Sequence, residues 1–432
     1  MRVVSGLALL MALASEAAGQ DSAAVHNTAW LRDRLFGDTS SAFKRLGYRT
    51  LSRLSQPVPP STDTRWRRSP AVEIVVGGQQ EMGLGLGLVY GPPVRPGPAP
   101  LRAELKALGR YGVTGSYDLR LQFLAPDLAA GWRFFLLAGA ERMVRTPYFG
   151  PDNKEIVEDS LKDRYSILYY RYALLRSTAF VAAQRHVAGP FWLHMAFQAR
   201  HYRTNSIVEQ PTLFATDVAA GRVDDTTRYT GFEGRLGFVT DSRDDWVAPK
   251  RGAYVEALVA LGRLRDDTRG STRSYHRYLV GLREFMLLGR RGRTVLALRQ
   301  RLVLPSNNLP YFLAYEHLTT GLPDDGVVGP RSIRLHGGGN QIASSQAFLS
   351  VDVRREAVVW RPDPMNPVRL WGLLLADVGV LGEPDQSFSE RRHEWTIGLG
   401  GRAQLARRTL LGLDVGWTDT GPGFSVVSYF AY

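Results

Sequence analysis

The chain has 432 residues, no cysteine and a formal net charge of +13 at pH 7. Without cysteine it can build neither a disulfide framework nor a thiol-based active site, although an oxidising compartment stays compatible with it. Its arginines are spread along the chain rather than gathered in a basic block with interleaved aromatic residues, so the charge does not indicate nucleic-acid binding. A basic surface of this kind better fits contact with anionic lipid headgroups or lipopolysaccharide.

The first 19 residues are typical of a cleaved secretory signal peptide. Met1 and Arg2 form a short basic start, residues 3–14 are apolar, and Ala17-Ala18-Gly19 is a small-residue cleavage site. The apolar run is too short to span a bilayer, and no later stretch approaches eighteen consecutive apolar residues. The sequence therefore predicts export without a transmembrane helix. A soluble secreted enzyme is the alternative.

Residues 20–69 differ from the rest of the chain. Apolar residues recur at roughly helical spacing from Trp30 to Leu54, and the Pro-rich linker 56–60 follows. Nine Lys/Arg against four acids give this segment a net charge of 9 − 4 = +5. We expect a short basic periplasmic leader. It is either an amphipathic helix at the membrane surface or the barrel mouth, or a poorly ordered segment.

From residue 70 to residue 432 the sequence predicts a series of strands in which apolar and polar residues alternate. About sixteen segments have the ~10-residue alternating pattern of outer-membrane barrels, joined by connections that nearly alternate between tight and long. The long polar connections are 144–163, 205–228 and 306–344. The predicted strands lie near 70–78, 82–91, 102–111, 113–124, 131–143, 164–186, 190–204, 229–241, 251–262, 274–288, 293–305, 345–359, 367–381, 393–405, 408–418 and 422–432.

The last two strands show the pattern most clearly. Apolar residues alternate with Gly and Asp from Leu411 to Trp417, and after a turn the alternation resumes through Phe424, Val426, Phe430 and Tyr432. A strand that ends the chain must pair with something, because an open sheet edge cannot lie in hydrocarbon. The sequence thus predicts an all-β fold, a transmembrane antiparallel β-barrel of about 16 strands whose first and last strands meet at a seam.

The charged residues of the strands indicate a filled lumen. In 190–204 and 345–359, apolar residues alternate with residues such as Arg200, Asp352 and Arg354. Arg or Asp facing lipid at mid-depth costs roughly 2–4 kcal/mol, so these side chains must face inward. A lumen dense in both signs of charge is cross-braced rather than open.

Two stretches, residues 238–255 and residues 332–354 with Leu375 to Gly379 after them, resemble motifs of a known family. This family is the bacterial surface antigen superfamily, which includes the barrel-assembly insertase and the two-partner secretion transporters. Residues 238–255, FVTDSRDDWVAPKRGAYV, resemble its TRDN…P-x-RG-x-Y turn signature. Residues 332–354, with Leu375 to Gly379 after them, resemble its VRGF/VRGY loop, the acid of the next strand and the DxG strand that follows. The matching turn residues are Asp241, Arg243, Asp244, Pro249, Arg251 and Gly252.

The resemblance implies a lock inside the barrel. In this family the long external loop folds into the lumen, and its Arg meets carboxylates on the wall; here the matching residues are Arg334, Asp352 and Asp377. Leu335 and His336 stand where the family has Gly and an aromatic residue, which puts full family function in doubt. Residues 20–69 are too few for a POTRA module, so the chain resembles a barrel-only member.

Motifs for chemistry are weak. His336-Gly337-Gly338-Gly339 imitates an esterase oxyanion motif, but no G-x-S-x-G elbow accompanies it. Gly83, Gly85 and Gly87 imitate a dinucleotide-binding loop without its spacing or βαβ context. The histidines lack metal-ligand spacing. The expectation is a protein that is not an enzyme, with no catalytic residues, cofactor or metal.

The resemblance implies a role in outer-membrane assembly or in polypeptide or lipid translocation. The alternatives are a loop-gated, porin-like diffusion channel and a structural surface protein. Expected partners are outer-membrane lipid and lipopolysaccharide, the host barrel-assembly machinery that inserts the chain, and possible outer-membrane protein clients. A homodimer is compatible with the sequence, and nucleic acid is not expected as a partner. The expected location is the outer membrane of a Gram-negative-type bacterium.

Overall fold

The structure is a computed structural model of the whole chain. It describes residues 67–76, 82–91, 103–112, 114–129, 131–152, 167–207, 211–224, 226–289, 292–306, 309–314, 316–321, 324–325, 333–335, 343–360, 368–405 and 409–427. The predicted signal peptide and nearly all of the predicted leader lie outside these residues, as do Phe430 and Tyr432.

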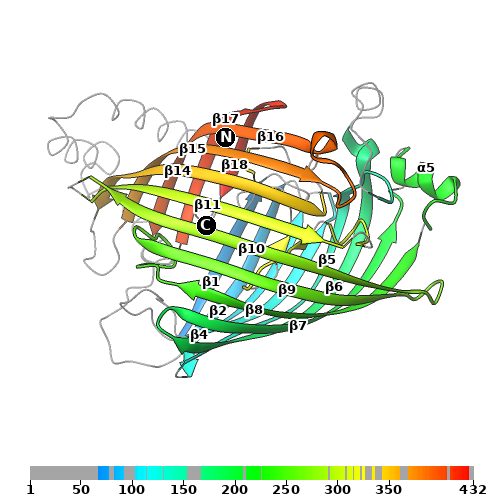
Figure 1. Ribbon diagram of the computed structural model, residues 1–432, viewed down its shortest axis with the longest axis horizontal. Coiled ribbons are helices and arrows are strands. Elements are labelled where there is room, and N and C mark those ends of the chain that lie inside the picture. Colours follow the sequence, from blue (N-terminus) through cyan, green and yellow to red (C-terminus); the bar gives the residue numbers. More distant parts are fainter. Residues whose placement is uncertain are drawn as a thin grey trace, which may run out of the picture.

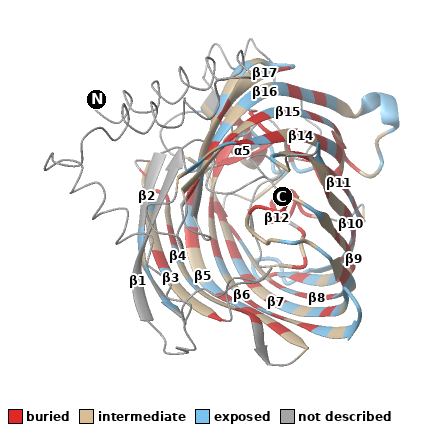
Figure 2. Ribbon diagram, turned by 90° about the vertical axis from the view of Figure 1, so that its left-hand side faces the viewer, coloured by how far each residue is buried: buried red, intermediate tan, exposed pale blue. Residues whose placement is uncertain are grey.

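Sixteen strands form one antiparallel sheet that curls around a central space (Figures 1 and 2). Each strand pairs with its neighbours in sequence, apart from a two-stranded insertion, β12 (Glu316–His317) and β13 (Asp324–Asp325), between β11 and β14. The sheet consists of β1 (Arg67–Val76), β2 (Met82–Gly91), β3 (Glu104–Gly112), β4 (Tyr117–Ala129), β5 (Trp132–Pro147), β6 (Arg171–Ala188), β7 (Phe191–Asn205), β8 (Thr227–Asp241), β9 (Gly252–Asp266), β10 (Thr272–Leu288), β11 (Thr294–Pro305), β14 (Ser345–Trp360), β15 (Val368–Gly382), β16 (Arg392–Leu405), β17 (Thr409–Thr418) and β18 (Gly421–Val427).

The predicted fold class, an antiparallel barrel of about sixteen strands, is confirmed. Every predicted strand corresponds to one observed strand, and the main difference in bounds is at β6. The sequence predicted this strand from residue 164, whereas it begins at Arg171 after a 3₁₀ turn, η1 (Ile167–Tyr170). In the sequence, the apolar residues Ile167 and Leu168 extend the hydrophobic pattern in front of Arg171, where the strand begins, which explains the error.

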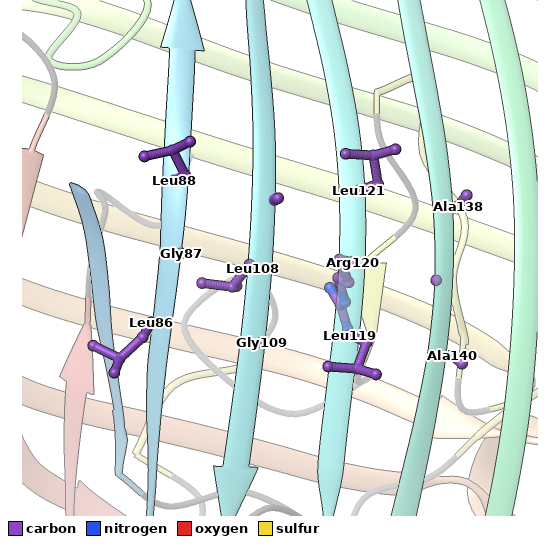
Figure 3. Close-up of a pocket in the computed structure, with 12 residues that line it drawn as sticks. Leu86, Gly87, Leu88, Leu108, Gly109, Leu119, Arg120, Leu121, Ala138 and Ala140 are labelled. Carbon is purple, nitrogen blue, oxygen red and sulfur yellow. The ribbon is translucent and has the colours of Figure 1, made fainter. Parts of the chain in front are cut away.

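The two faces of the sheet separate as the alternation predicts. On β7, Met195 and Phe197 are 45% and 49% exposed, whereas His194 and Gln198, which flank them, are 0% and 1% exposed. The outward face is therefore the apolar one, as a lipid-facing surface requires. On β2–β5 this face has a shallow hollow where Gly109, Ala138 and Ala140 lie between leucines (Figure 3). Those leucines are Leu86, Leu88, Leu119 and Leu121.

The connections differ in length at the two ends of the sheet. Turns of few residues join β4 to β5, β6 to β7 and β10 to β11 at one end. The connections β5–β6, β7–β8 and β11–β14 at the other end are long. Short periplasmic turns and long external loops are the usual asymmetry of such barrels, so we refer to these as the turn end and the loop end.

The helical elements among the described residues are short and lie at the loop end. The helix α5 (Leu213–Ala219) is capped at its N-terminus by Thr212, whose hydroxyl accepts a hydrogen bond from the Ala215 amide at 3.1 Å. A second 3₁₀ turn, η2 (Phe388–Glu390), lies between β15 and β16. None of the helices in the described part of the chain is both long and apolar enough to cross a bilayer.

The first and last strands are neighbours in space. β1 and β18 lie beside each other, so the sheet returns to its starting point. Among the residues that the structure describes, however, hydrogen-bonded ladders run from β1 round to β18 without joining these two strands. The first and last strands are thus neighbours, and the pairing between them that the sequence predicted stays a prediction.

Candidate functional site: a loop held inside the barrel

The connection between β11 and β14 enters the barrel. Its residues Glu316 and His317 form β12, which pairs with β13 (Asp324–Asp325) inside the ring of strands (Figure 2). We refer to the described residues 316–321 and 333–335 as the lumen segment. Its side chains meet a wall of buried ionisable residues of both signs, as the sequence predicted for the lumen. Those wall residues include Arg133, Glu141, Arg176, Arg200, Glu233, Arg235, Glu256, Arg277, Arg299, Arg301, Asp352, Arg354, Asp377, Arg402 and Asp414.

Arg334 is bound by two wall carboxylates. Its Nε donates to Asp377 Oδ2 at 2.8 Å and its Nη2 to Asp377 Oδ1 at 2.5 Å, which is a bidentate pair, while Nη1 donates to Asp352 Oδ1 at 2.5 Å. The Arg334 amide also donates to Asp377 Oδ2 at 2.8 Å. All three side chains are at most 1% exposed. The structure thus brings together the three residues named from the sequence, in the fork geometry that a guanidinium gives with carboxylates.

Leu335 follows in an unusual backbone conformation. Its φ is +66°, which no other non-glycine residue adopts in the described ranges. Such a conformation costs of order 1–3 kcal/mol, so its surroundings must hold it in place. The hydroxyl of Thr396 on β16 donates to the Arg334 carbonyl at 2.6 Å, which fixes the peptide before Leu335. A glycine at this position would adopt this φ without strain.

A row of glycines makes room for Leu335. Gly398, Gly416 and Gly423 are directly opposite one another on β16, β17 and β18. A Cβ at Gly398 or Gly416 would lie 3.0 or 2.9 Å from Leu335 Cδ1, and one at Gly423 would collide with the Leu335 carbonyl oxygen. The lumen segment therefore packs directly against the last strand. Of these three glycines, the sequence pattern marked only Gly416, as a small residue alternating with Val415 and Trp417.

Glu316 is a second ionic anchor, on the opposite part of the wall. Its carboxylate accepts hydrogen bonds from Arg176 Nη1 at 3.0 Å and from the Tyr202 hydroxyl, and lies 2.5 Å from Arg200 Nη2. Arg176 is paired in turn with Glu141 on β5. One buried loop carboxylate is thereby surrounded by donors from β6 and β7. Sequence reasoning missed Glu316 because a single acid in a long polar loop carries no pattern.

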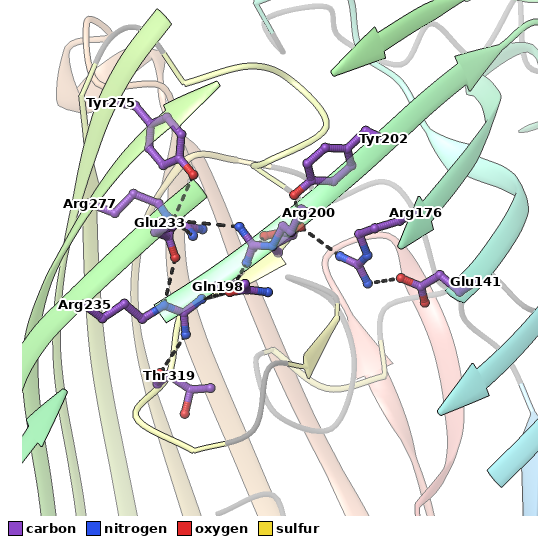
Figure 4. Close-up of polar contacts among 11 residues, drawn as sticks. Glu141, Arg176, Gln198, Arg200, Tyr202, Glu233, Arg235, Tyr275, Arg277 and Thr319 are labelled. Atoms are coloured by element: carbon purple, nitrogen blue, oxygen red, sulfur yellow. Dashed lines mark hydrogen bonds and ion pairs between the residues drawn. The ribbon is translucent and has the colours of Figure 1, made fainter. Parts of the chain in front are cut away.

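The wall behind Glu316 is a connected polar network (Figure 4). Glu233 accepts from Arg235 Nε at 2.8 Å and from the Tyr275 hydroxyl at 3.1 Å, and it is also paired with Arg277. Arg235 then donates from Nη1 to the Thr319 carbonyl at 3.1 Å. The lumen segment is therefore bound through its backbone as well as its side chains, and a buried network of this kind fixes one arrangement when its members are satisfied.

Thr320 and Leu318 complete this anchor. The Thr320 hydroxyl donates to Glu256 Oε2 at 2.7 Å, and its carbonyl accepts from Gln184 Nε2 at 3.2 Å. Leu318, 1% exposed, packs in an apolar cluster with Leu258 and residues of the neighbouring strands. The lumen segment thus bridges two walls: residues 316–320 bind β6–β11, and residues 333–335 bind β14–β18.

An aromatic cluster closes the loop end above the segment. Tyr148, Phe214 and Tyr311 meet edge to face, with ring centroids of Tyr148 5.1 Å from each of the other two. The Tyr148 hydroxyl donates to Asp217 of α5 at 2.6 Å. Tyr311 and Phe312 come from the same connection as Glu316, so the cluster ties the start of that connection to the β5–β6 and β7–β8 loops.

The residues of the predicted turn motif hydrogen-bond mainly to one another. Asp241 accepts from Arg243 Nε at 2.9 Å, and Asp244 Oδ1 accepts from the amides of Lys250 and Arg251 at 2.8 and 3.1 Å. Gly252 has φ +96°, and a Cβ there would collide with the Ser242 carbonyl. Pro249 is buried and Arg251 is exposed. These residues therefore shape the β8–β9 turn at the turn end, remote in the chain from the Arg334 centre.

The seam residues are described only in part. Phe424 on β18 is 65% exposed on the outer face. Val426 is paired with Leu413 on β17, and its side chain lies outside the described set. Phe430 and Tyr432 also lie outside it. Their predicted role as a terminal recognition signal stays a prediction.

Gly423→Ala tests the contact between the lumen segment and β18. The added methyl collides with the Leu335 carbonyl, so we expect a loss of about 1–3 kcal/mol in stability, the usual cost of overpacking. Heat-modifiable electrophoretic mobility of the purified barrel measures the loss as a lower unfolding temperature. Gly401→Ala is the control, because a Cβ at Gly401 has no atom within 4 Å. Equal unfolding temperatures for the two variants would contradict the contact.

Glu383, in the connection between β15 and β16, makes the loop end sensitive to pH. Burial raises the pKa of its carboxyl to about 7, while hydrogen bonds from Ser344 and the charge of Arg392 oppose the rise. A raised pKa in the folded state adds stability at pH values below the unfolded pKa, and this contribution is lost as the pH rises towards 7. Native-state hydrogen exchange at Ser344, whose amide donates to Glu383 at 3.1 Å, should therefore accelerate between pH 5 and 7 after correction for the intrinsic rate.

Glu383→Gln removes the titrating group and should abolish that pH dependence while keeping an acceptor for the Ser344 amide. A variant that retains the full acceleration would show that another group is responsible.

Comparison with known proteins supports the fold. No protein-family profile matches the sequence, and no characterised protein matches it by sequence. Among solved structures, BamA from Haemophilus ducreyi lacking POTRA domains 1–3 matches with a TM-score of 0.50 and 11% identity, over 90% of this chain and 76% of that one. CdiB from Escherichia coli matches with a TM-score of 0.53 and 10% identity, over 88% and 68% of the two chains. The chain therefore has the β-barrel fold of BamA and CdiB, as the sequence motifs led us to expect.

Proposed function

We propose that this protein is an outer-membrane barrel that acts in outer-membrane assembly or in the translocation of polypeptide or lipid, with the lumen segment as its internal lock. The observation that carries the proposal is the pair of anchors described above. Arg334 binds Asp352 and Asp377 on one wall, and Glu316 binds Arg176 and Arg200 on the other. A lumen held shut from both sides does not suit a wide diffusion pore.

The seam supports a role at the wall of the barrel. β1 and β18 are neighbours that lack a ladder among the described residues, and the last strand also contacts Leu335. An exposed strand edge is a template for pairing with another strand. We propose that outer-membrane proteins or segments in transit pair at this edge. On this proposal the chemistry is entirely non-covalent and the protein is not an enzyme.

Photo-crosslinking in cells tests the seam. A photoreactive residue replaces Phe424 on β18, which is 65% exposed, and in a control protein it replaces Leu261 on β9, which is 63% exposed on the opposite wall. We expect adducts with other outer-membrane proteins from position 424 and none from position 261. Equal adducts from both positions, or none from either, would contradict a client-handling seam.

A loop-gated channel is the second candidate, because the same anchors would also serve as a gate. Removal of one partner of a buried ion pair costs about 3–5 kcal/mol, so Arg334→Ala should release residues 333–335 from the wall. If the protein is a gated channel, planar-bilayer conductance should rise severalfold in Arg334→Ala and again in the double variant with Glu316→Gln. The control is Arg251→Ala, which changes an exposed residue of the β8–β9 turn.

Closed lumens in all these variants, together with client adducts at position 424, would reject the channel and favour the assembly or translocation role.

A further inference from the structure

Four arginines lie together on the outer face of the barrel near the loop end: Arg203 on β7, Arg228 on β8, and Arg263 and Arg265 on β9. We refer to them as the basic rim. Their strand neighbours Tyr202 and Leu264 are 0% and 1% exposed and face inward. Because side chains alternate along a strand, the four arginines face outward.

The basic rim lies at the edge of the apolar outer band. Arg263 is directly opposite Phe232, which is 52% exposed and stacks on Phe197 with ring centroids 6.0 Å apart. Leu261, two residues before Arg263 on β9, is 63% exposed. The arginines therefore stand where an apolar, aromatic band gives way to charge, which is the level of the lipid headgroups.

The arrangement of the basic rim is unfavourable without an anion. Arg203 and Arg228 are directly opposite each other in the β7–β8 register, and like charges in that position repel. Arg265 lies opposite Thr230, two residues from Arg228, which adds a third positive charge to the same place. The registers thus place Arg203, Arg228 and Arg265 within two positions of one another on adjacent strands, with Arg263 two residues before Arg265 on the same face.

The acids nearby are too few to neutralise the rim. Asp267 lies 3.7 Å from Arg265 Nε and 3.9 Å from His201 Nδ1, and it accepts a hydrogen bond from Thr230 at 2.7 Å. Asp224 is paired with Arg269 at 2.7 Å. Within the described ranges, the side chains of Arg228 and Arg263 have neither an ion pair nor a hydrogen bond, and Arg203 has no ion pair.

The rim is confined to one side of the barrel. On the opposite side, the exposed outer residues near the loop end of β15, β16 and β17 include Val378, His393, Trp395 and Trp417. In the described part of those strands, the outward positions at this end hold no arginine. General solubility or membrane anchoring would not require this asymmetry.

We propose that the basic rim binds the phosphate groups of a phosphorylated glycolipid in the leaflet at the loop end. A guanidinium matches two phosphate oxygens with its fork, and Arg203, Arg228 and Arg265 lie within two register positions of one another here. The apolar band just below, with Phe197, Phe232 and Leu261, accommodates the acyl chains of the same lipid. This site is separate from the lumen segment and from the seam.

The test measures lipid A bound to the full chain in phosphatidylcholine nanodiscs, by mass spectrometry of the purified discs. The triple variant R228Q/R263Q/R265Q should bind lipid A roughly tenfold or more weakly, since each arginine near an anionic surface contributes to affinity. The variant with lysine at all three positions should retain part of the binding, because it keeps the charge. Rising salt should weaken binding by the wild-type protein.

The control variant R185Q/R355Q removes two exposed arginines elsewhere on the strands. It should bind lipid A like the wild type, and heat-modifiable mobility should show that every variant is folded. Equal binding by the triple variant, equal loss in the control variant, or salt-independent binding by the wild type would overturn the proposal. Displacement of lipid A by equimolar inorganic phosphate would do so as well, since the site would then recognise free phosphate rather than lipid.

Discussion

The pairing of buried guanidinium groups with carboxylates is the interaction on which the interior of this barrel depends. Charge cannot face lipid at mid-depth, so the strands direct it inward, and once inside it must be neutralised. Arg402 and Asp414 show this within the wall, with Nη1–Oδ1 and Nη2–Oδ2 distances of 2.7 and 2.8 Å. The lumen segment takes part in the same pairing through Arg334 and Glu316, so it belongs to the folded wall.

Much of the fold could be predicted because lipid imposes a strict code on the sequence. One face must be apolar, so a period of two marks each strand, and turn residues mark the ends. The pattern failed before Arg171, where an apolar stretch forms the 3₁₀ turn Ile167–Tyr170 rather than a strand, and Tyr170 packs in the aromatic cluster at the loop end. Local pattern cannot distinguish these two uses of the same residues.

The site could be predicted in part. Arg334, Asp352 and Asp377 were identified through a motif with fixed order, and they do meet. Glu316, Thr320 and the glycine row could not be identified, because their role depends on where a long loop crosses the lumen. That path is set by contacts between residues far apart in sequence, such as Arg176 with Glu316, for which no local pattern exists.

Leu335 and the glycines opposite it form a complementary set, which has a consequence for sequence variation. A leucine occupies a backbone conformation that favours glycine, and glycines occupy the three wall positions that it touches. In this chain the leucine side chain in the loop fills the volume that the wall glycines leave free. Among related sequences, residue size at position 335 should therefore covary inversely with size at positions 398, 416 and 423, so that a glycine in the loop accompanies larger side chains on the last three strands.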